Sequence, residues 1–146
     1  MNFILKTKTK ATSKEAVMAK FTSELFILLA PPFPKIKLLR FDGSEKGNEI
    51  HIEMDFIFYK KLWISLITEH GSTSNELYFI DEGTTVPAPI KYWKHLHVVR
   101  AINSGIEIED NLTYTSGNKV VDLLLFPFVY GLILYRNPIY KKIFSS

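Results

Sequence analysis

The chain has 146 residues, of which 47% are hydrophobic and 23% are charged. This balance is ordinary for a globular protein and excludes intrinsic disorder, so we expect one domain over residues 1–146. The formal net charge of +3 is small and spread along the chain, which argues against a nucleic-acid partner. Cysteine is absent, which excludes disulfides, thiolate chemistry and cysteine-based zinc sites and fits a reducing, cytoplasmic location.

The apolar stretches of the sequence lack the features of a secretion signal or a membrane span. The amino-terminal segment "MNFILKTKTK" has only a short apolar run before alternating lysines, unlike a signal peptide. The most apolar stretch, Val120–Tyr135, is shorter than the roughly 20 residues of a spanning helix and contains Asp122 and Pro127. We therefore expect no stable insertion into a membrane.

The first elements predicted are one strand and one helix. The segment "NFILKTKT", Asn2–Thr9, alternates apolar residues with lysines, as a half-buried strand does. A single helix is predicted from Thr12 or Ser13, either of which can cap it, as far as Pro31. The prolines that begin at Pro31 end this helix, because proline lacks an amide hydrogen and clashes with the preceding turn.

Beyond these prolines the pattern has a period of two as far as Thr115, and turn sequences separate the apolar segments. Short turns between consecutive strands indicate an antiparallel meander. A last helix is predicted over Lys119–Phe144, kinked near Pro127 and Pro138. The sequence thus predicts an α+β fold in which a seven-stranded curved antiparallel sheet wraps around a long carboxy-terminal helix. The strands of the meander are predicted at Lys35–Phe41, Glu49–Phe56, Leu62–Glu69, Leu77–Glu82, Tyr92–Arg100 and Ile106–Thr115.

Two neighbouring strands carry polar side chains on the face predicted to point inward. In "YWKHLHVVR" the basic residues mark the outer face, which sends Trp93, His95 and His97 inward. In "GIEIEDNLTYT" the glutamates mark the outer face, so Asp110 points inward among apolar residues. A buried carboxylate without a partner is costly, so Asp110 should pair with one of these histidines or with Arg136.

The sequence leaves several uses of this polar group open. It can be a satisfied cluster that fixes the packing, or a polar floor that orients the head group of a ligand. A histidine beside a carboxylate is also a plausible general base, although no activated nucleophile or phosphate loop accompanies it. His95 and His97 could bind one metal ion with Asp110, but this spacing is common by chance and no metal-binding motif supports it. We therefore predict no catalytic residue, no metal and no cofactor.

The last predicted helix is apolar on every side. Leu125, Phe128 and Leu132 belong to one apolar stripe, but Val120 and Leu134 make the other side apolar too. Packing against the sheet and the amino-terminal helix is the simplest explanation. The alternatives are a dimer contact, or transient docking on a membrane that delivers a lipid-like ligand. We accordingly expect a monomer or a homodimer.

The chain resembles the SRPBCC superfamily, which includes the START lipid-transfer domains, the birch-pollen-allergen proteins and the polyketide cyclases. It is most similar to small bacterial ligand-binding proteins of that superfamily, which share the pattern W-x-H-x-H, then D-x-x-x-Y, then a final helix ending in Y-R. The matching residues are "APIKYWKHLH", Asp110 with Tyr114, and "LYRNPIYKKIF". The segments "LAPPFPKIKLLRFDG" and "WISLITEHG" extend the likeness over nearly the whole chain.

The resemblance implies a helix-grip fold with an apolar cavity between the curved sheet and the last helix, which binds a hydrophobic or amphipathic small molecule such as a lipid, an isoprenoid or a polyketide. On this reading the protein is a non-catalytic carrier or sensor, its apolar side chains supply affinity, and its polar ones orient a carboxylate, carbonyl or hydroxyl group. The residues predicted to bind the ligand are Ile52, Met54, Phe56, Trp93, His95, His97, Ile108, Asp110, Leu112, Tyr114, Phe128, Leu132 and Arg136.

Two readings from other classes remain. The first is an enzyme of the polyketide cyclase, aromatase or small lyase type, in which His95 or His97 is the acid and base and Asp110 orients it. The second is an interaction protein whose cavity is filled by side chains and whose last helix is a dimer contact.

Overall fold

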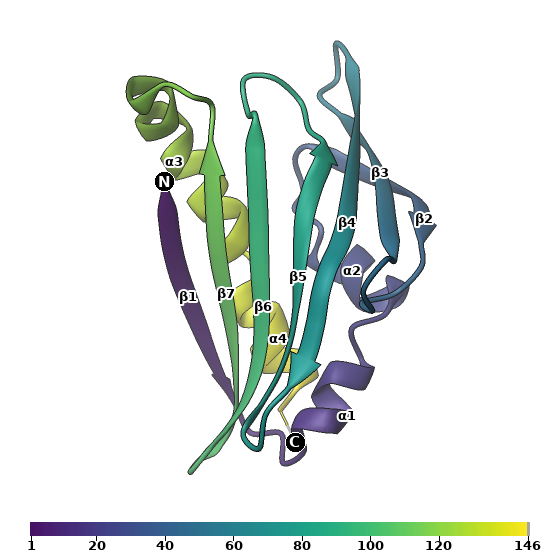
Figure 1. Ribbon diagram of the computed structural model, residues 1–146, viewed down its shortest axis with the longest axis vertical. Coiled ribbons are helices and arrows are strands. Elements are labelled where there is room, and N and C mark those ends of the chain that lie inside the picture. Colours follow the sequence, from purple (N-terminus) through teal and green to yellow (C-terminus); the bar gives the residue numbers. More distant parts are fainter. Residues whose placement is uncertain (146) are drawn as a thin grey trace.

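The computed structural model describes residues 1–145 and contains one seven-stranded antiparallel sheet with the helices on one of its faces (Figure 1). The sheet order is β1-β7-β6-β5-β4-β3-β2, so the predicted meander runs from β2 to β7 and the first strand pairs with the last. The predicted α+β class and antiparallel sheet are confirmed. The strands are β1 (Asn2–Thr9), β2 (Lys35–Phe41), β3 (Glu49–Asp55), β4 (Lys60–Ser72), β5 (Glu76–Thr85), β6 (Tyr92–Ile102) and β7 (Gly105–Thr115).

The amino-terminal helical segment consists of two short helices, α1 (Lys14–Ala19) and α2 (Ser23–Leu29), so the prediction of one continuous helix is wrong. Ser13 caps α1 as predicted, because its hydroxyl accepts a hydrogen bond from the amide of Ala16. The break turns Phe21 toward the sheet, where its ring meets that of Phe79 with 5.8 Å between centroids. Burial of this aromatic ring favours the break over a continuous helix, which would orient it differently.

The carboxy-terminal segment forms α3 (Lys119–Leu134) and α4 (Arg136–Ile143), which Tyr135 separates. The helix is interrupted just before Pro138, as predicted. The other proline at which a kink is predicted, Pro127, lies inside α3, which continues past it. Pro138 is the third residue of α4, a position where the amide hydrogen has no partner within the helix, so the proline is tolerated there. The prediction of one long, proline-interrupted helix is therefore confirmed in its bounds.

Residues Lys119–Ile143 are, by length and composition alone, long and apolar enough to cross a membrane. In the fold the amino-terminal end of this segment is attached to the sheet by hydrogen bonds. The Asp122 carboxylate accepts hydrogen bonds from the amide and the hydroxyl of Ser116, both at 2.6 Å. The hydroxyl of Tyr114 donates to the Asp122 carbonyl at 2.7 Å. Withdrawing α3 from the sheet would break the bond from Tyr114, which belongs to β7.

In Figure 1 the carboxy-terminal helices run behind the sheet, from α3 behind β7 to α4, which is seen behind β6 and β5; the strands nearest to their backbones are β1 and β7. Val129 and Ile133 of α3 pack directly on Leu112 and Tyr114 of β7, and Tyr140 of α4 packs in a second cluster with residues of α1 and β6. The opposite side, toward β2, faces α2 instead. Register shifts in β2 and β4 bend this half of the sheet, as bulges do. Space therefore remains between the bent strands, α2 and α3.

Candidate functional site

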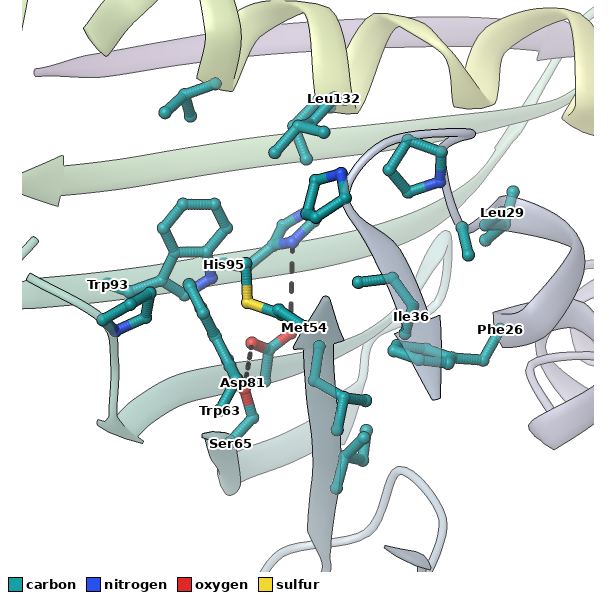
Figure 2. Close-up of a pocket in the computed structure, with 18 of the residues that line it drawn as sticks. Phe26, Leu29, Ile36, Met54, Trp63, Ser65, Asp81, Trp93, His95 and Leu132 are labelled. Atoms are coloured by element: carbon teal, nitrogen blue, oxygen red, sulfur yellow. Dashed lines mark hydrogen bonds and ion pairs between the residues drawn. The ribbon is translucent and has the colours of Figure 1, made fainter. Parts of the chain in front are cut away.

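A cavity of about 580 Å³ occupies this space. It extends from α2 and β2 on one side to β6 on the other, with α3 across it. Figure 2 shows Phe26, Leu29 and Ile36 at one end and Trp93, Asp81 and His95 at the other. Apart from that polar end, the side chains that line it are mostly aliphatic or aromatic. The apolar lining includes Leu25, Phe26, Leu29, Ile36, Phe41, Ile50, Ile52, Met54, Phe56, Trp63, Phe79, Trp93, Leu125, Phe128, Val129, Leu132 and Ile133.

Most of the residues predicted to bind a ligand lie in the cavity wall. The structure brings together side chains from β3, β6, α3 and α4, as the alternation of inward and outward residues indicates. The predicted residues that line the cavity are Ile52, Met54, Phe56, Trp93, His95, His97, Phe128, Leu132 and Arg136. Their role in binding a ligand stays a prediction.

The four predicted residues on β7 do not line the cavity. Leu112 and Tyr114 are fully buried under α3, and Ile108 is buried in the cluster that contains Tyr140. Asp110 is buried as well and reaches the site only through the side chains that it contacts. The inward direction of β7 is as predicted, but the carboxy-terminal helices lie directly on this strand and leave no space in front of it. The placement of these four residues in the cavity wall is therefore corrected.

The polar end of the cavity is built around Asp110. Its Oδ1 accepts a hydrogen bond from Nε2 of His95 at 2.8 Å and lies 3.8 Å from Nδ1 of His97. It also lies 3.5 Å from the guanidinium of Arg136 on α4. The two imidazole rings stack on one another with 3.7 Å between their centroids, because residues two apart on a strand share a face. All three partners considered for this carboxylate thus surround it.

A second carboxylate, that of Asp81 on β5, completes the group and was not among the predicted residues. Its Oδ2 accepts a hydrogen bond from Nε2 of His97 at 2.5 Å and lies 4.0 Å from Nδ1 of His95. Ser65 donates to its other oxygen at 3.4 Å and itself accepts from the indole of Trp63. The sequence does carry a signal for Asp81, because alternation along β5 places it on the same face as the buried Phe79.

Burial and hydrogen bonding set the protonation of these groups. Burial, together with the neighbouring His95, lowers the pKa of His97 to about 4, and the carboxylates of Asp81 and Asp110 oppose this only in part. Burial raises the pKa of both carboxyls, but hydrogen bonds from the imidazoles and the charge of Arg136 outweigh it, so both pKa values are lowered. At neutral pH the cluster therefore combines a neutral His97 with two carboxylates and one guanidinium.

The β3–β4 turn and the start of α3 lie at the same end of the molecule (Figure 1). Tyr59 and Phe128 both line the cavity and are exposed to solvent. The turn also presents Ile57 and Phe58, which are 76% and 93% exposed. Ile57 has a φ of 79°, a conformation that is unfavourable for a β-branched residue. We call this group of exposed residues the apolar rim; it comprises Ile57, Phe58, Tyr59, Val120, Leu123, Leu124 and Phe128.

The same arrangement of elements occurs in solved structures. Protein NE0264 from Nitrosomonas europaea is similar to this chain with a TM-score of 0.62 and 16% sequence identity, over 97% of this chain and 95% of its own. Ms6760 from Mycobacterium smegmatis has a TM-score of 0.60 and 12% identity, over 94% and 89%. Ara h 8.0201 has a TM-score of 0.59 and 11% identity, over 95% and 96%. The chain shares the fold of these structures, a helix-grip fold in which a seven-stranded antiparallel sheet lies against a long carboxy-terminal helix.

No protein-family model matches the sequence, and no curated protein does. The fold that the resemblance implies is confirmed, since the structural likeness covers nearly the whole of each chain. At this level of sequence identity the likeness establishes the architecture, whereas the ligand has to be argued from the side chains of the cavity.

Proposed function

We propose that this chain is a cytoplasmic, non-catalytic carrier or sensor that binds one hydrophobic or amphipathic small molecule, of the lipid, isoprenoid or polyketide kind, in its cavity. The observation that carries the proposal is an apolar cavity of about 580 Å³ that contains a buried polar group at one end. This volume lies within the range of about 300 to 1,000 Å³ typical of small-molecule sites. An apolar tail would gain affinity from burial, and the polar end would fix its orientation.

The charges at the polar end select among head groups. Asp110 is the carboxylate that lies 3.5 Å from Arg136, whereas Asp81 lines the cavity and has the imidazole of His97 and the hydroxyl of Ser65 as its hydrogen-bond donors. A second negative charge repels a carboxylate in a site with little water. We therefore expect a hydroxyl or carbonyl group to bind better than a free carboxylate, which narrows the range of head groups inferred from the sequence.

A direct test uses three ligands with the same ten-carbon tail, namely decanol, decanoate and decylamine, measured by calorimetry in the presence of EDTA. We expect decanol to bind more tightly than decanoate. Met54→Trp, which fills the cavity from β3, should weaken decanol binding at least tenfold, because it removes the space for the tail. Glu53→Gln, on the outer face of the same strand, is the matched control and should leave binding unchanged.

The outcomes divide clearly. Equal binding of decanol by the wild type and by Met54→Trp would refute a site in this cavity. Tighter binding of decanoate than decanol would refute the role given to Asp81. A lipid-sized mass released on denaturation of protein purified from its own host, and detected by native mass spectrometry, would identify the natural ligand class.

We also propose that the apolar rim contacts a lipid bilayer briefly during loading, without spanning it. Two members of the rim, Tyr59 and Phe128, line the cavity. The exposed lysines Lys60, Lys91 and Lys119 flank the same turns and the start of α3. Apolar side chains combined with lysines favour the surface of an anionic membrane. The unfavourable backbone of Ile57 supports this role, because such strain is retained where an exposed conformation is used. A spanning helix is disfavoured, since it would detach Asp122 from Tyr114 and Thr115 of β7.

Co-sedimentation with vesicles tests this contact. Binding is expected to vesicles of phosphatidylcholine with phosphatidylglycerol, less to phosphatidylcholine alone, and to decrease with salt. Phe58→Ser should reduce binding several-fold. Leu39→Ser makes the same kind of change, apolar to polar, at an exposed position on β2 and should leave binding unchanged. Vesicle binding that Phe58→Ser leaves intact would refute the contact, and concentration-dependent dimerisation lost in the same variant would assign the rim to a second copy of the chain.

A further inference from the structure

We infer that Asp81, His95 and His97 form a binding site for one divalent transition-metal ion at the polar end of the cavity. One ligand atom from each of the three residues lies within 4.8 Å of the other two. The inference goes beyond ligand binding and does not depend on it. It also departs from the expectation of no metal drawn from the sequence, where Asp110 was the only carboxylate considered.

The separations fit a single ion after small movements of side chains. Zinc binds imidazole nitrogen and carboxylate oxygen at about 2.1 Å, so two of its ligands stand at most about 4.2 Å apart. The Asp81 Oδ2 lies 2.5 Å from the His97 Nε2 and 4.0 Å from the His95 Nδ1. Entry of an ion requires the shorter of these two contacts to open. The imidazole rings of His95 and His97 stack on one another, so one nitrogen of each ring lies near the same Asp81 oxygen.

The surroundings of the three residues supply the outer hydrogen bonds that metal sites require. A histidine that binds a metal through one nitrogen usually donates its other N–H to a carboxylate, which fixes its tautomer and orientation. The Nε2 of His95 donates to Asp110 at 2.8 Å, so its Nδ1 presents a lone pair toward Asp81. Asp110 would be a positioning residue, and Ser65 would hold the second oxygen of Asp81 in the same way.

A buried nitrogen of His97 gives a second observation in favour of a metal ion. Its Nδ1 is buried and has no hydrogen-bond partner among the described residues, although Asp110 Oδ1 is only 3.8 Å away. If an ion takes the lone pair of Nε2, the proton of neutral His97 moves from Nε2 to Nδ1. The new N–H then faces Asp110, and rotation of the ring brings it within bonding distance. The metal-bound form would thus satisfy a group that is otherwise left unpaired.

Charge and ligand type define the class of ion. When both imidazoles are neutral, as metal binding requires, Arg136 compensates Asp110 and leaves the negative charge of Asp81 for the cation. Two imidazoles and one carboxylate suit zinc or ferrous iron and are poor ligands for calcium or magnesium. The three residues all line the cavity, so the remaining coordination positions face its interior. A bound ion would reverse the head-group preference, because its positive charge attracts a carboxylate.

The experiment measures binding of zinc and cobalt(II) to the full chain after EDTA treatment and its removal, with no organic ligand present. We expect one zinc ion per chain by calorimetry, a higher melting temperature with zinc, and a visible absorption spectrum with cobalt. Asp81→Asn and His97→Gln should each weaken zinc binding more than tenfold. Asp110→Asn should weaken it about 10- to 100-fold and shift the cobalt bands, which a purely structural role would not do.

His70→Gln is the matched control, because His70 is an exposed histidine outside the cavity. The zinc affinity of this variant should stay within twofold of wild type. Urea unfolding of each variant shows whether it is folded, and the more conservative Asp81→Asn decides the result if His97→Gln is unstable. Absence of saturable binding to the wild type, or binding that Asp81→Asn leaves unchanged, would overturn the inference. Decanol binding in EDTA is unaffected by either result, so the two proposals fail separately.

Discussion

Acidification should destabilise this protein through His97 before its carboxylates begin to titrate. Burial lowers the pKa of His97 from an ordinary value of 6.5 to about 4 in the folded protein. Below pH 6.5 the unfolded chain therefore binds a proton that the folded chain does not, so stability falls as pH falls. The contribution of neutral His97 to the free energy of unfolding is complete above pH 6.5 and is lost by about pH 4.

The size of the effect follows from the two affinities for the proton. Each tenfold difference in proton affinity between the folded and unfolded states corresponds to about 1.4 kcal/mol. The difference at His97 then amounts to about 3 kcal/mol, a large part of the stability of an ordinary domain. The titratable groups that act on this ring are His95, Asp81 and Asp110. The lowered pKa values of the two carboxyls act in the same direction, but only below about pH 4.

Urea unfolding in EDTA, followed by tryptophan fluorescence at pH values from 7.5 to 4.5, measures this effect. His97→Gln keeps an N–H donor for Asp81 and does not titrate, so its stability should depend much less on pH than that of the wild type. His70→Gln, at an exposed position, should follow the wild type. Parallel curves for the wild type and His97→Gln would refute the reasoning. A wild type that gains stability on acidification would mean that His97 is charged when folded and paired with Asp81.

Three further changes test other features of the structure. Gly105→Ala should destabilise the protein by several kcal/mol in urea unfolding, because the new Cβ would lie 2.2 Å from the Thr9 carbonyl and φ is +148°. The buried hydroxyl of Tyr140 lies near the Arg136 guanidinium but makes no well-aligned hydrogen bond to the described residues. Tyr140→Phe should therefore change stability by at most about 1 kcal/mol; a larger loss would reveal a hydrogen bond to Arg136. Ile57→Asn should raise the free energy of unfolding by about 1 kcal/mol, because asparagine tolerates positive φ, and should weaken vesicle binding; unchanged stability would argue against strain there.

Local sequence patterns determined most of the secondary structure and the direction of the strand side chains. Alternation along β3 and β6 identified Met54, Trp93, His95 and His97 as inward, and all four line the cavity. The same local rule could have identified Asp81, because the face of a strand is set by the period of two in its own residues. The number and antiparallel order of the strands followed from short turns, which leave the chain no room for another connection.

Which inward residues reach the cavity was decided only by the tertiary structure. Leu112 and Tyr114 point inward as predicted, yet α3 lies on them and the cavity forms beside β7. The position of a helix across a sheet depends on side-chain packing and on the bends in β2 and β4, neither of which has a local period.

Which residues form the polar end of the cavity was also decided by the tertiary structure. Asp81 and Ser65 come from β5 and β4, and Arg136 comes from α4, so no single stretch of sequence contains them together. The sequence by itself determined the fold, the inward histidines and the need of Asp110 for a partner. Only the tertiary structure placed a second carboxylate on the other side of those histidines, because that contact depends on the register between β5 and β6, where Asp81 lies opposite His95.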